Sequence, residues 1–319
     1  MSEVDASKVD AVVLVGGKGT RLRPLTLSAA KPMLPTAGLP FLTHLLSRIA
    51  EAGIEHVILG TSYKAATFES EFGDGSKLGL QIDYVTEEHP LGTGGGIANV
   101  VPKLRHDTVM VFNGDVLSGM DLRQMLSSHR QSQADLTLHL VRVSDPRAFG
   151  CVPTDSDGNV QAFLEKTEDP PSDQINAGTY IFKREILDRI PRGREVSVER
   201  EVFPALLADG VKVCGYVDAS YWRDMGTPED FVRGSADLVR GIAPSPALGG
   251  RRGRAWCTTV LQWPLVPFSS AGPWWAAVPR SGPASDWTAP WCSTARASRR
   301  ARWWSGRSSV PVRASGRVR

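Results

Sequence analysis

Apolar residues occur along the chain in short blocks of two alternating kinds. Residues 9–15 are apolar almost throughout, which is typical of a strand buried on both faces, and a glycine cluster follows them directly. Residues 41–49 carry apolar side chains at helical spacing, and this pattern stops at Gly53. The same alternation predicts further strands at 56–59, 80–85, 108–112, 136–143, 178–182 and 212–217, and further helices at 65–72, after Gly94, at 122–130, up to Ile190, at 198–208 and at 228–240.

Strands that alternate with helices over short connections predict an α/β fold. We expect a Rossmann-like, mostly parallel sheet with helices on both of its faces. The pattern holds over residues 1–242, which we expect to form one domain. A linker rich in Pro and Gly is expected at 243–250, followed by an irregular tail at 251–319 in which no helical or strand periodicity persists.

Electrical charge divides at nearly the same boundary. Residues 1–250 contain 25 of the 37 basic residues and 33 of the 34 acidic ones, whereas the tail contains twelve Arg and one acid, so the net charge of +3 is the balance of −8 and +11. Eight of the nine Trp also lie in the tail. Arginine beside stacking aromatic residues is the composition of single-strand nucleic-acid binders, so a basic interaction tail is one interpretation.

The tail has a second interpretation, which we favour. Its Trp-Trp and Trp-Cys pairs begin at Trp256, Trp274, Trp291 and Trp303, at spacings close to multiples of six. Since TGG encodes Trp and TGY encodes Cys, each pair becomes an aliphatic residue followed by Val in the adjacent reading register. Aliphatic residues at six-residue intervals are typical of a hexapeptide β-helix. We therefore interpret the tail as an out-of-frame remnant of such a domain and expect no nucleic-acid partner.

Targeting signals and metal-binding cysteines are not predicted. The chain has no run of eighteen apolar residues and its first residues are polar and acidic, so neither a membrane span nor a secretory signal is expected and the location should be cytoplasmic. The four cysteines are scattered, which favours reduced thiols.

The glycine cluster after the first predicted strand combines backbone freedom with positive charge. It contains the candidate residues Gly16, Gly17, Gly19 and Thr20, with Lys18, Arg21, Arg23 and Lys31 within or after it. Backbone N–H groups in such a turn can approach an anion while the cations neutralise it. The spacing fits neither the dinucleotide fingerprint nor the P-loop. The segment predicts a phosphate-binding loop; the alternative is a solvated turn with surface cations.

Three further segments follow predicted strands or lie late in the domain. Glu87, Gly92 and Thr93 belong to a second glycine-rich turn, Asp115 follows a third strand, and Asp224 precedes the last helix. Open α/β sheets bind ligands at the carboxyl ends of their strands, so we expect these segments to meet there. Two carboxylates together suit Mg²⁺, which prefers oxygen ligands. The alternative is that Asp115 is a turn residue and Asp224 a helix cap.

Six motifs occur in the order seen in sugar-1-phosphate nucleotidyltransferases: GGKGTRLRPLT with KP at 16–32, PLGTGGG at 90–96, FNGD at 112–115, FLEK at 163–166, INAGTYIF at 175–182 and YWRDMGTPEDF at 221–231. Over residues 9–240 the chain resembles this family, and within it the branch of mannose-1-phosphate guanylyltransferases. The resemblance implies an enzyme that joins an NTP to a sugar 1-phosphate and releases pyrophosphate, with residues 1–242 as its catalytic domain.

The resemblance also implies roles for individual residues. Arg21, Lys31, Asp115 and Asp224 would be catalytic, with Mg²⁺ held by Asp115 and Asp224; Gly16, Gly17, Gly19, Thr20, Glu87, Gly92 and Thr93 would bind the nucleotide; Gly150, Glu165, Lys166 and Asn176 would bind the sugar phosphate. Guanine offers N–H donors, so a carboxylate such as Glu87 or Glu88 would favour GTP, and mannose 1-phosphate is the expected acceptor. The alternatives are a glucose-1-phosphate thymidylyl- or uridylyltransferase and a non-catalytic regulatory subunit. A homo-oligomer is compatible with the sequence.

Overall fold

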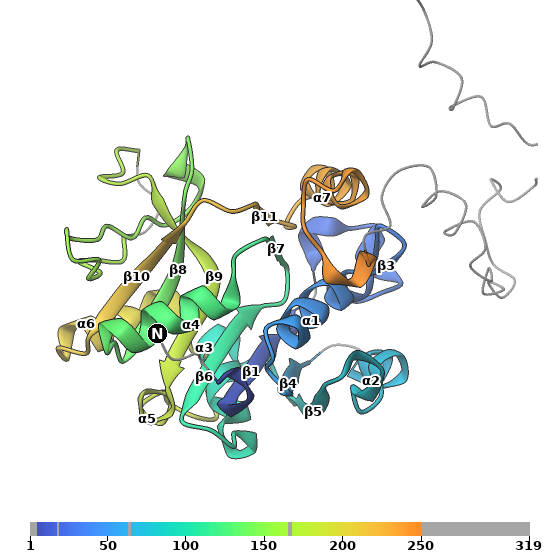
Figure 1. Cartoon of the computed structure of the whole chain (residues 1–319), viewed down its shortest axis with the longest axis horizontal. Helices are drawn as coiled ribbons and strands as arrows, with labels where there is room; N and C mark the ends of the chain where they lie inside the picture. Colours follow the sequence, from blue (N-terminus) through green and yellow to red (C-terminus); the bar gives the residue numbers. More distant parts are fainter. Residues whose placement is uncertain (1–4, 18, 63–64, 165–167, 250–319) are drawn as a thin grey trace, which may run out of the picture. The chain divides into compact units, whose positions relative to one another are not determined.

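The computed structural model describes residues 5–249, except for residues 18, 63–64 and 165–167 (Figure 1). Four predictions lie outside the described residues: the charge that Lys18 would supply, the sugar-phosphate roles of Glu165 and Lys166, and the irregular tail at 251–319. Within the described residues, no helix is long and apolar enough to cross a membrane.

Seven strands form the central sheet, in the order β10-β8-β9-β6-β1-β4-β5. Their bounds are β1 (Val9–Leu14), β4 (His56–Thr61), β5 (Gln81–Thr86), β6 (Thr108–Asn113), β8 (Leu136–Arg142), β9 (Gln174–Lys183) and β10 (Val213–Asp218). Strands β5, β4, β1 and β6 are mutually parallel, β8 is parallel to β10, and β9 runs antiparallel to both β6 and β8. The predicted mostly parallel sheet is confirmed.

Helices pack on both faces of this sheet, as predicted. One core contains apolar side chains of α1 (Phe41–Glu51), α2 (Ala65–Phe72) and α4 (Leu122–Ser132), and the other contains those of α3 (Gly92–Val100), α5 (Arg184–Leu187) and α6 (Phe203–Ala208). In β1, Ala11 and Val13 face the first core and Val12 faces the second. Burial on both sides explains why this strand is a nearly continuous apolar run.

The helix predicted over 198–208 is divided at its middle. Residues Val198–Val202 form a π-helical turn, η8, and α6 begins at Phe203. Pro204 has no N–H to donate into a continuous α-helical ladder, which accounts for the break. Single π-helical turns are rare and occur frequently at functional sites.

Two short antiparallel pairs lie outside the main sheet and were not predicted, because strands of two or three residues show no periodicity. They are β2 (Pro35–Thr36) with β3 (Leu39–Pro40), and β7 (Val116–Ser118) with β11 (Trp222–Asp224). The second pair brings Asp224 opposite Val116, directly after Asp115. The helix α7 (Pro228–Arg240) is capped by Thr227, whose hydroxyl accepts from the Asp230 N–H. Asp224 is therefore not its cap.

Residues 243–249, expected as a linker, instead pack against the domain. The turn η9 (Pro246–Leu248) lies against α1, and Ala243 and Leu248 are buried. The Ser245 hydroxyl lies 2.8 Å from Nδ1 of His44 on α1. The remaining short turns are η1 (Ala6–Lys8), η2 (Thr20–Leu22), η3 (Leu25–Leu27), η4 (Lys31–Met33), η5 (Ser76–Leu78), η6 (Val101–Lys103) and η7 (Pro146–Ala148).

Candidate active site

The predicted phosphate loop lies at the carboxyl end of β1. Its backbone takes the left-handed conformation at Gly17 (φ +103°) and Gly19 (φ +55°), which glycine adopts without a steric cost. The Thr26 hydroxyl donates to the Gly19 carbonyl at 2.8 Å and holds the turn closed. A cavity of about 310 Å³, here called the loop cavity, is lined by the predicted residues Gly16, Gly17, Gly19, Thr20, Arg21, Lys31, Thr93 and Asp115, and also by Asn113, Gly114 and Gly226.

Two carboxylates and two cations meet at the edge of the loop cavity. The buried Lys31 Nζ donates to Asp115 Oδ2 at 2.8 Å. The Met225 N–H donates to the Asp115 carbonyl at 3.0 Å, which ties β11 to the end of β6. Burial and then the negative charge of Asp115 raise the pKa of Asp224, while Lys31 and Arg21 act in the opposite direction. Such a shift arises from charges held close together in a site with little water.

Gly226 allows the Asp224 carboxylate and the Arg21 guanidinium to approach each other. A Cβ at this glycine would lie 2.9 Å from Asp224 Oδ2 and 3.1 Å from Arg21 Nη1. A side chain there would push apart two groups that we expect to act on phosphate. This gives a physical reason for glycine at position 226 that does not involve backbone torsion.

Within the described residues, no group of three or more His, Cys, Asp or Glu side chains is arranged around a common point. The pair Asp115 and Asp224 nevertheless fits a hard divalent cation, because its donors are carboxylate oxygens, and burial together with the charge of Asp115 raises the pKa of Asp224. A cation of this kind obtains its other ligands from water and substrate phosphates.

A second cavity, of about 580 Å³, adjoins the first and is here called the sugar cavity. Its lining includes the predicted residues Arg21, Asp224, Gly150 and Asn176, together with Phe149, Cys151, Phe163, Leu164, Glu199 and Arg200. Arg21 lines both cavities. A Cβ on Gly150 would lie 2.9 Å from the Leu164 carbonyl, so glycine lets two chain segments approach at this wall. The arrangement offers two binding volumes that share one guanidinium.

Sequence reasoning missed Glu199 and Arg200. Both belong to η8, and the Asn176 side-chain amide donates to Glu199 Oε1 at 2.6 Å and to the Tyr180 hydroxyl at 2.8 Å. Tyr180 is fully buried, and its burial raises the pKa of its phenol. The sequence around Glu199 carries no recognisable motif; the rarity of a π-helical turn is a structural signal rather than a sequence signal.

Two predicted nucleotide residues do not line either cavity. Glu87 Oε2 accepts the Leu91 N–H at 3.4 Å, and burial raises the pKa of the Glu87 carboxyl. Gly92 begins α3 with φ +69°, and a Cβ there would lie 2.6 Å from the Val196 carbonyl. In this structure both residues therefore shape the turn before α3.

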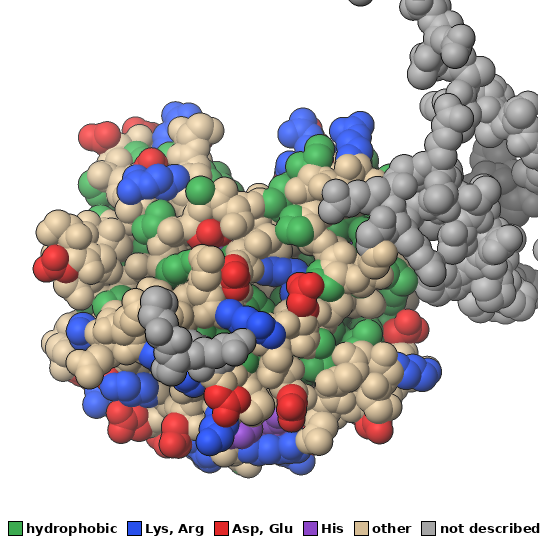
Figure 2. Space-filling view, viewed as in Figure 1, with side chains coloured by type: hydrophobic (Ala, Val, Ile, Leu, Met, Phe, Trp, Pro, Cys, Tyr) green, Lys and Arg blue, Asp and Glu red, His purple; other side chains and the backbone are tan. Residues whose placement is uncertain are grey.

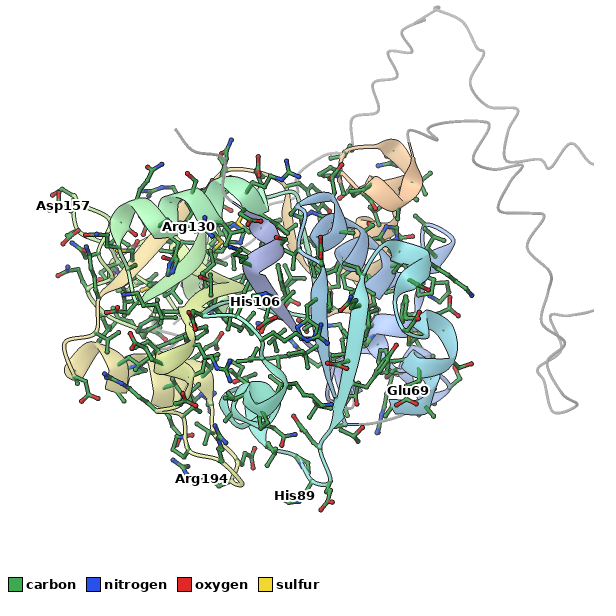
Figure 3. The ribbon with its side chains drawn as sticks, turned by 60° about the horizontal axis from the view of Figure 1, so that its bottom comes forward. Glu69, His89, His106, Arg130, Asp157 and Arg194 are labelled. Atoms are coloured by element: carbon green, nitrogen blue, oxygen red, sulfur yellow. The ribbon has the colours of Figure 1, made fainter. Side chains whose placement is uncertain are left out.

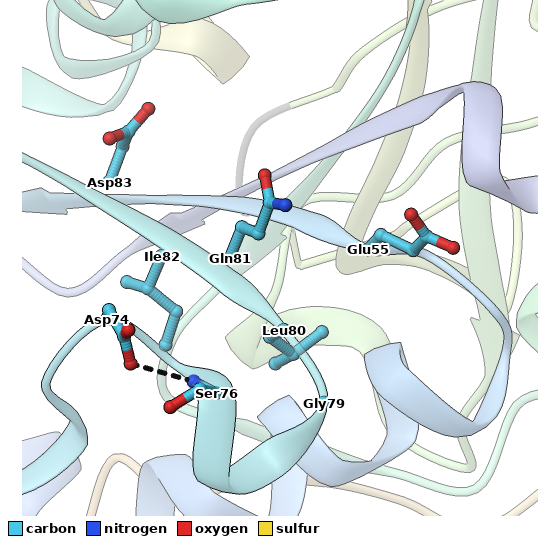
Figure 4. Close-up of a pocket in the computed structure, with 8 residues that line it drawn as sticks. All are labelled: Glu55, Asp74, Ser76, Gly79, Leu80, Gln81, Ile82 and Asp83. Atoms are coloured by element: carbon cyan, nitrogen blue, oxygen red, sulfur yellow. Dashed lines mark hydrogen bonds between the residues drawn. The ribbon is translucent and has the colours of Figure 1, made fainter.

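A depression at the opposite, amino-terminal end of the strands is acidic (Figure 4). It has a volume of about 550 Å³, and its lining includes Glu55, Asp74 and Asp83. Asp74 accepts the Ser76 N–H at 3.0 Å, a contact within its own turn. An anionic substrate would be repelled by these carboxylates, so this depression is not a candidate phosphate site.

Charged side chains on the face shown in Figure 2 are interspersed by sign. That part of the described surface has no continuous basic stripe of the kind that follows a nucleic-acid backbone. The positive charge of the site is local to its two cavities, where Arg21 and Lys31 lie.

A Rossmann-like sheet with an anion-binding glycine loop and paired carboxylates at its carboxyl edge defines a nucleotide-binding protein suited to phosphoryl or nucleotidyl transfer. The sequence matches the family model described as nucleotidyl transferase over residues 10–241. The chain belongs to the nucleotidyl transferase family.

Individual relatives narrow this assignment. The chain is 83% identical over 247 residues to a mannose-1-phosphate guanylyltransferase of Mycobacterium tuberculosis (strain ATCC 25618 / H37Rv). The match covers 77% of this chain and 69% of that relative. It is 38% identical over 227 residues to the mannose-1-phosphate guanylyltransferase catalytic subunit beta of Drosophila pseudoobscura pseudoobscura, covering 70% of this chain and 61% of that one. The predicted resemblance is confirmed, and these matches favour the mannose-1-phosphate guanylyltransferase branch over a thymidylyl- or uridylyltransferase and over a non-catalytic regulatory subunit.

Solved structures agree with the fold. HddC from Yersinia pseudotuberculosis, complexed with GMP-PN, aligns with a TM-score of 0.63 at 30% identity over 72% of this chain and 99% of its own. A putative glucose-1-phosphate thymidylyltransferase from Bacillus anthracis, in complex with a sucrose, aligns with a TM-score of 0.67 over 78% of this chain and 99% of its own. At 20% identity, the second match supports the fold alone.

Proposed function

We propose that this protein transfers a guanylyl group from GTP to mannose 1-phosphate, giving GDP-mannose and pyrophosphate. The observation that carries the proposal is the sharing of Arg21 between the loop cavity and the sugar cavity, with Asp115 lining the first and Asp224 the second. A nucleotide in one cavity and a sugar phosphate in the other would bring their phosphates together beside these groups.

The reaction needs positioning and neutralisation of charge rather than a covalent intermediate. An oxygen of the sugar phosphate attacks the α-phosphorus of the NTP in line, a P–O bond forms, and the bond to the β-phosphate oxygen breaks to release pyrophosphate. The backbone N–H groups of Gly16, Gly17, Gly19 and Thr20 would hold the triphosphate. Arg21 and Lys31 would stabilise negative charge on the α-phosphate and on the departing pyrophosphate.

A divalent cation, which we propose is Mg²⁺, would be held by Asp115 and Asp224. When bound, it supplies positive charge to the reacting phosphates. Lys31 would then donate to phosphate oxygens as well as to Asp115, because its ammonium group carries several N–H donors and both acceptors are negatively charged oxygens. An Asp115→Asn variant is expected to be inactive and still bind nucleotide; an active variant would remove the metal role from Asp115.

On the sugar side, Gly150 and Asn176 would contact the sugar, and Glu165 and Lys166 are proposed from their motif to bind its hydroxyls and phosphate. Glu199 and Arg200 support this role for the sugar cavity, because they add hydrogen-bonding groups to its wall. Gly92 and Thr93 are proposed to bind the nucleotide from the start of α3.

Specificity for guanine is proposed to depend on Glu87, whose carboxylate is the partner that guanine N1–H and N2–H₂ would favour. In the structure Glu87 Oε2 accepts the Leu91 N–H at the long distance of 3.4 Å. Breaking this weak hydrogen bond should cost little free energy if the carboxylate rotates toward a bound base. We expect wild-type kcat/KM with mannose 1-phosphate to be highest for GTP among GTP, dTTP, UTP and ATP. Glu87→Gln should narrow the preference for GTP more than Glu88→Gln does, because Glu87 is half-buried and Glu88 is exposed. A preference for dTTP with glucose 1-phosphate would overturn the proposal.

We also propose that residues 251–319 are an out-of-frame remnant of a β-helix domain. The composition of this tail supports the idea, and the Mycobacterium tuberculosis relative has 31% of its length outside the match with this chain. Resequencing the gene tests it: an error or frameshift near codon 250 is expected, with aliphatic residues six apart in the other register. A confirmed frame without that pattern would contradict it. The cytoplasmic location and the homo-oligomer stay predictions.

A further inference from the structure

The first turn of α3 is held by a segment that lies a hundred residues further along the chain. The Val196 N–H donates to the Leu91 carbonyl at 2.8 Å, and the Gly94 N–H donates to the Val196 carbonyl at 2.8 Å. Figure 3 shows Arg194 and His89 on neighbouring loops at the same edge of the molecule. The segment 194–198 therefore lies directly across the start of α3.

This crossing explains the glycine run in the PLGTGGG motif. A Cβ on Gly95 would lie 2.6 Å from the Arg194 carbonyl, and one on Gly94 would lie 2.9 Å from the Val196 side chain. Both glycines are buried, so a larger residue could not turn to solvent. Backbone contact with segment 194–198, rather than contact with phosphate, is what this structure requires of these glycines.

Thr93 makes the contact that leads onward to the sugar cavity. Its hydroxyl oxygen accepts the Val198 N–H at 2.9 Å, while Thr93 itself lines the loop cavity. Val198 is buried and is the first residue of η8, which carries Glu199 and Arg200 in the wall of the sugar cavity. The Thr93 hydroxyl thus links the wall of the loop cavity to η8, in the wall of the sugar cavity, through one hydrogen bond to the backbone.

We propose that Thr93 is a positioning residue that fixes the start of η8, and with it Glu199 and Arg200, for the sugar phosphate. The proposal deepens the function proposed above and rests on it. A hydroxyl is needed at this place because the Val198 N–H is buried at the beginning of a helix, where backbone donors lack partners within the helix. The hydroxyl hydrogen stays available for donation to a bound nucleotide. Thr93 can therefore contact the nucleotide while it orients Glu199 and Arg200 for the sugar phosphate.

Thr93→Val tests the proposal because it keeps the size and branching of the side chain and removes the acceptor. We expect the KM for mannose 1-phosphate to rise about tenfold and the KM for GTP to rise by a smaller factor of about threefold, since the hydroxyl also offers one hydrogen bond to the nucleotide. Thr93→Ser keeps the hydroxyl and is expected to stay within about twofold of wild type for both substrates. The denaturation midpoint of each variant is measured alongside, and Thr93→Ala replaces Thr93→Val if the latter does not fold.

A double-mutant cycle separates positioning from a general loss of structure. If Thr93 acts through η8, Thr93→Val should raise the KM for mannose 1-phosphate much less in a Glu199→Gln background than in the wild type. Equal effects in both backgrounds, or a rise in the KM for GTP alone, would overturn the inference. A wild-type protein that makes no nucleotide sugar from any NTP and sugar phosphate would instead contradict the proposed function, so the two failures are distinguishable.

Discussion

Carboxylates lie at both ends of the parallel strands, fully buried at one end and half-buried at the other, and their surroundings differ. At the amino-terminal end, the fully buried Asp10 accepts hydrogen bonds from His56 Nδ1 (2.7 Å), His106 Nδ1 (2.9 Å), and the N–H groups of Arg105 (2.6 Å) and His106 (2.8 Å). Burial alone would raise the pKa of Asp10; these hydrogen bonds outweigh it and lower the pKa to about 2. This carboxylate stabilises the fold.

At the carboxyl end the direction is reversed. Burial and the charge of Asp115 raise the pKa of Asp224, so the folded protein destabilises the charged form of this side chain. A carboxylate kept at a cost to stability is expected where a ligand supplies the missing positive charge. The comparison predicts that residues at the carboxyl end affect catalysis, whereas the cluster around Asp10 affects stability.

Asp224→Asn should give the largest effect. We expect kcat to fall by at least about a hundredfold, since a charged group beside the reacting phosphates is lost. The free energy of unfolding should stay unchanged or rise, because the amide carries no charge to be desolvated. Steady-state kinetics and urea denaturation of the same preparation measure both quantities. Substantial residual activity, or a clear fall in the free energy of unfolding, would show that Asp224 stabilises the fold rather than acting in catalysis.

Asp10→Asn is the reciprocal variant. Replacing a buried carboxylate that has four hydrogen-bond donors should lower the free energy of unfolding by about 3 kcal/mol. The KM values for both substrates should be unchanged below the denaturation midpoint, because Asp10 lies at the other end of β1 from the loop cavity. Urea denaturation and steady-state kinetics measure the two outcomes. A selective loss of kcat without destabilisation would contradict the assignment of Asp10 to fold stability.

The pH dependence of stability sharpens the role of Asp10. Its pKa is lower in the folded state than the ordinary value of 3.8, so its contribution is complete above that value and is lost as the pH falls toward 2. The loss should amount to about 2 kcal/mol. Between pH 5 and pH 2, the free energy of unfolding from denaturation curves should fall by this additional amount in the wild type compared with Asp10→Asn. An equal fall in the two proteins would contradict the role of Asp10.

Gly226→Ala should give a smaller effect, confined to activity. The new methyl group would displace Asp224 or Arg21, and we expect kcat/KM to fall about tenfold or more. Gly60→Ala is the matched control, since a Cβ there has ordinary contacts of 3.5 Å and longer. Similar kinetics for the two variants would show that Asp224 and Arg21 tolerate displacement.

The elements that surround the site were predictable because their signals are local. Burial on both faces made β1 an apolar run, and a glycine turn with nearby cations marked the loop that follows it. The pairing of β7 with β11 was not predictable, since three-residue strands leave no periodic pattern and their partners are a hundred residues apart.

The sugar cavity was harder to predict than the loop cavity. Glu199 enters its wall because η8 is anchored on α3, a contact between distant segments that a single sequence does not reveal. Gly94 and Gly95 belong to the PLGTGGG motif, and their packing against segment 194–198, which the sequence does not reveal, gives a structural reason for glycine at both positions. The packing of 243–249 was missed for a similar reason, because Pro and Gly mark turns whether or not the turn is buried.

We propose that the charges at the carboxyl edge promote the transfer of a nucleotidyl group to a sugar phosphate. A time course with the full chain, GTP, mannose 1-phosphate and Mg²⁺ tests this by quantifying GDP-mannose and pyrophosphate. Equimolar formation of the two products is expected. Absence of pyrophosphate release with every combination of NTP and sugar 1-phosphate, from a folded preparation, would contradict it.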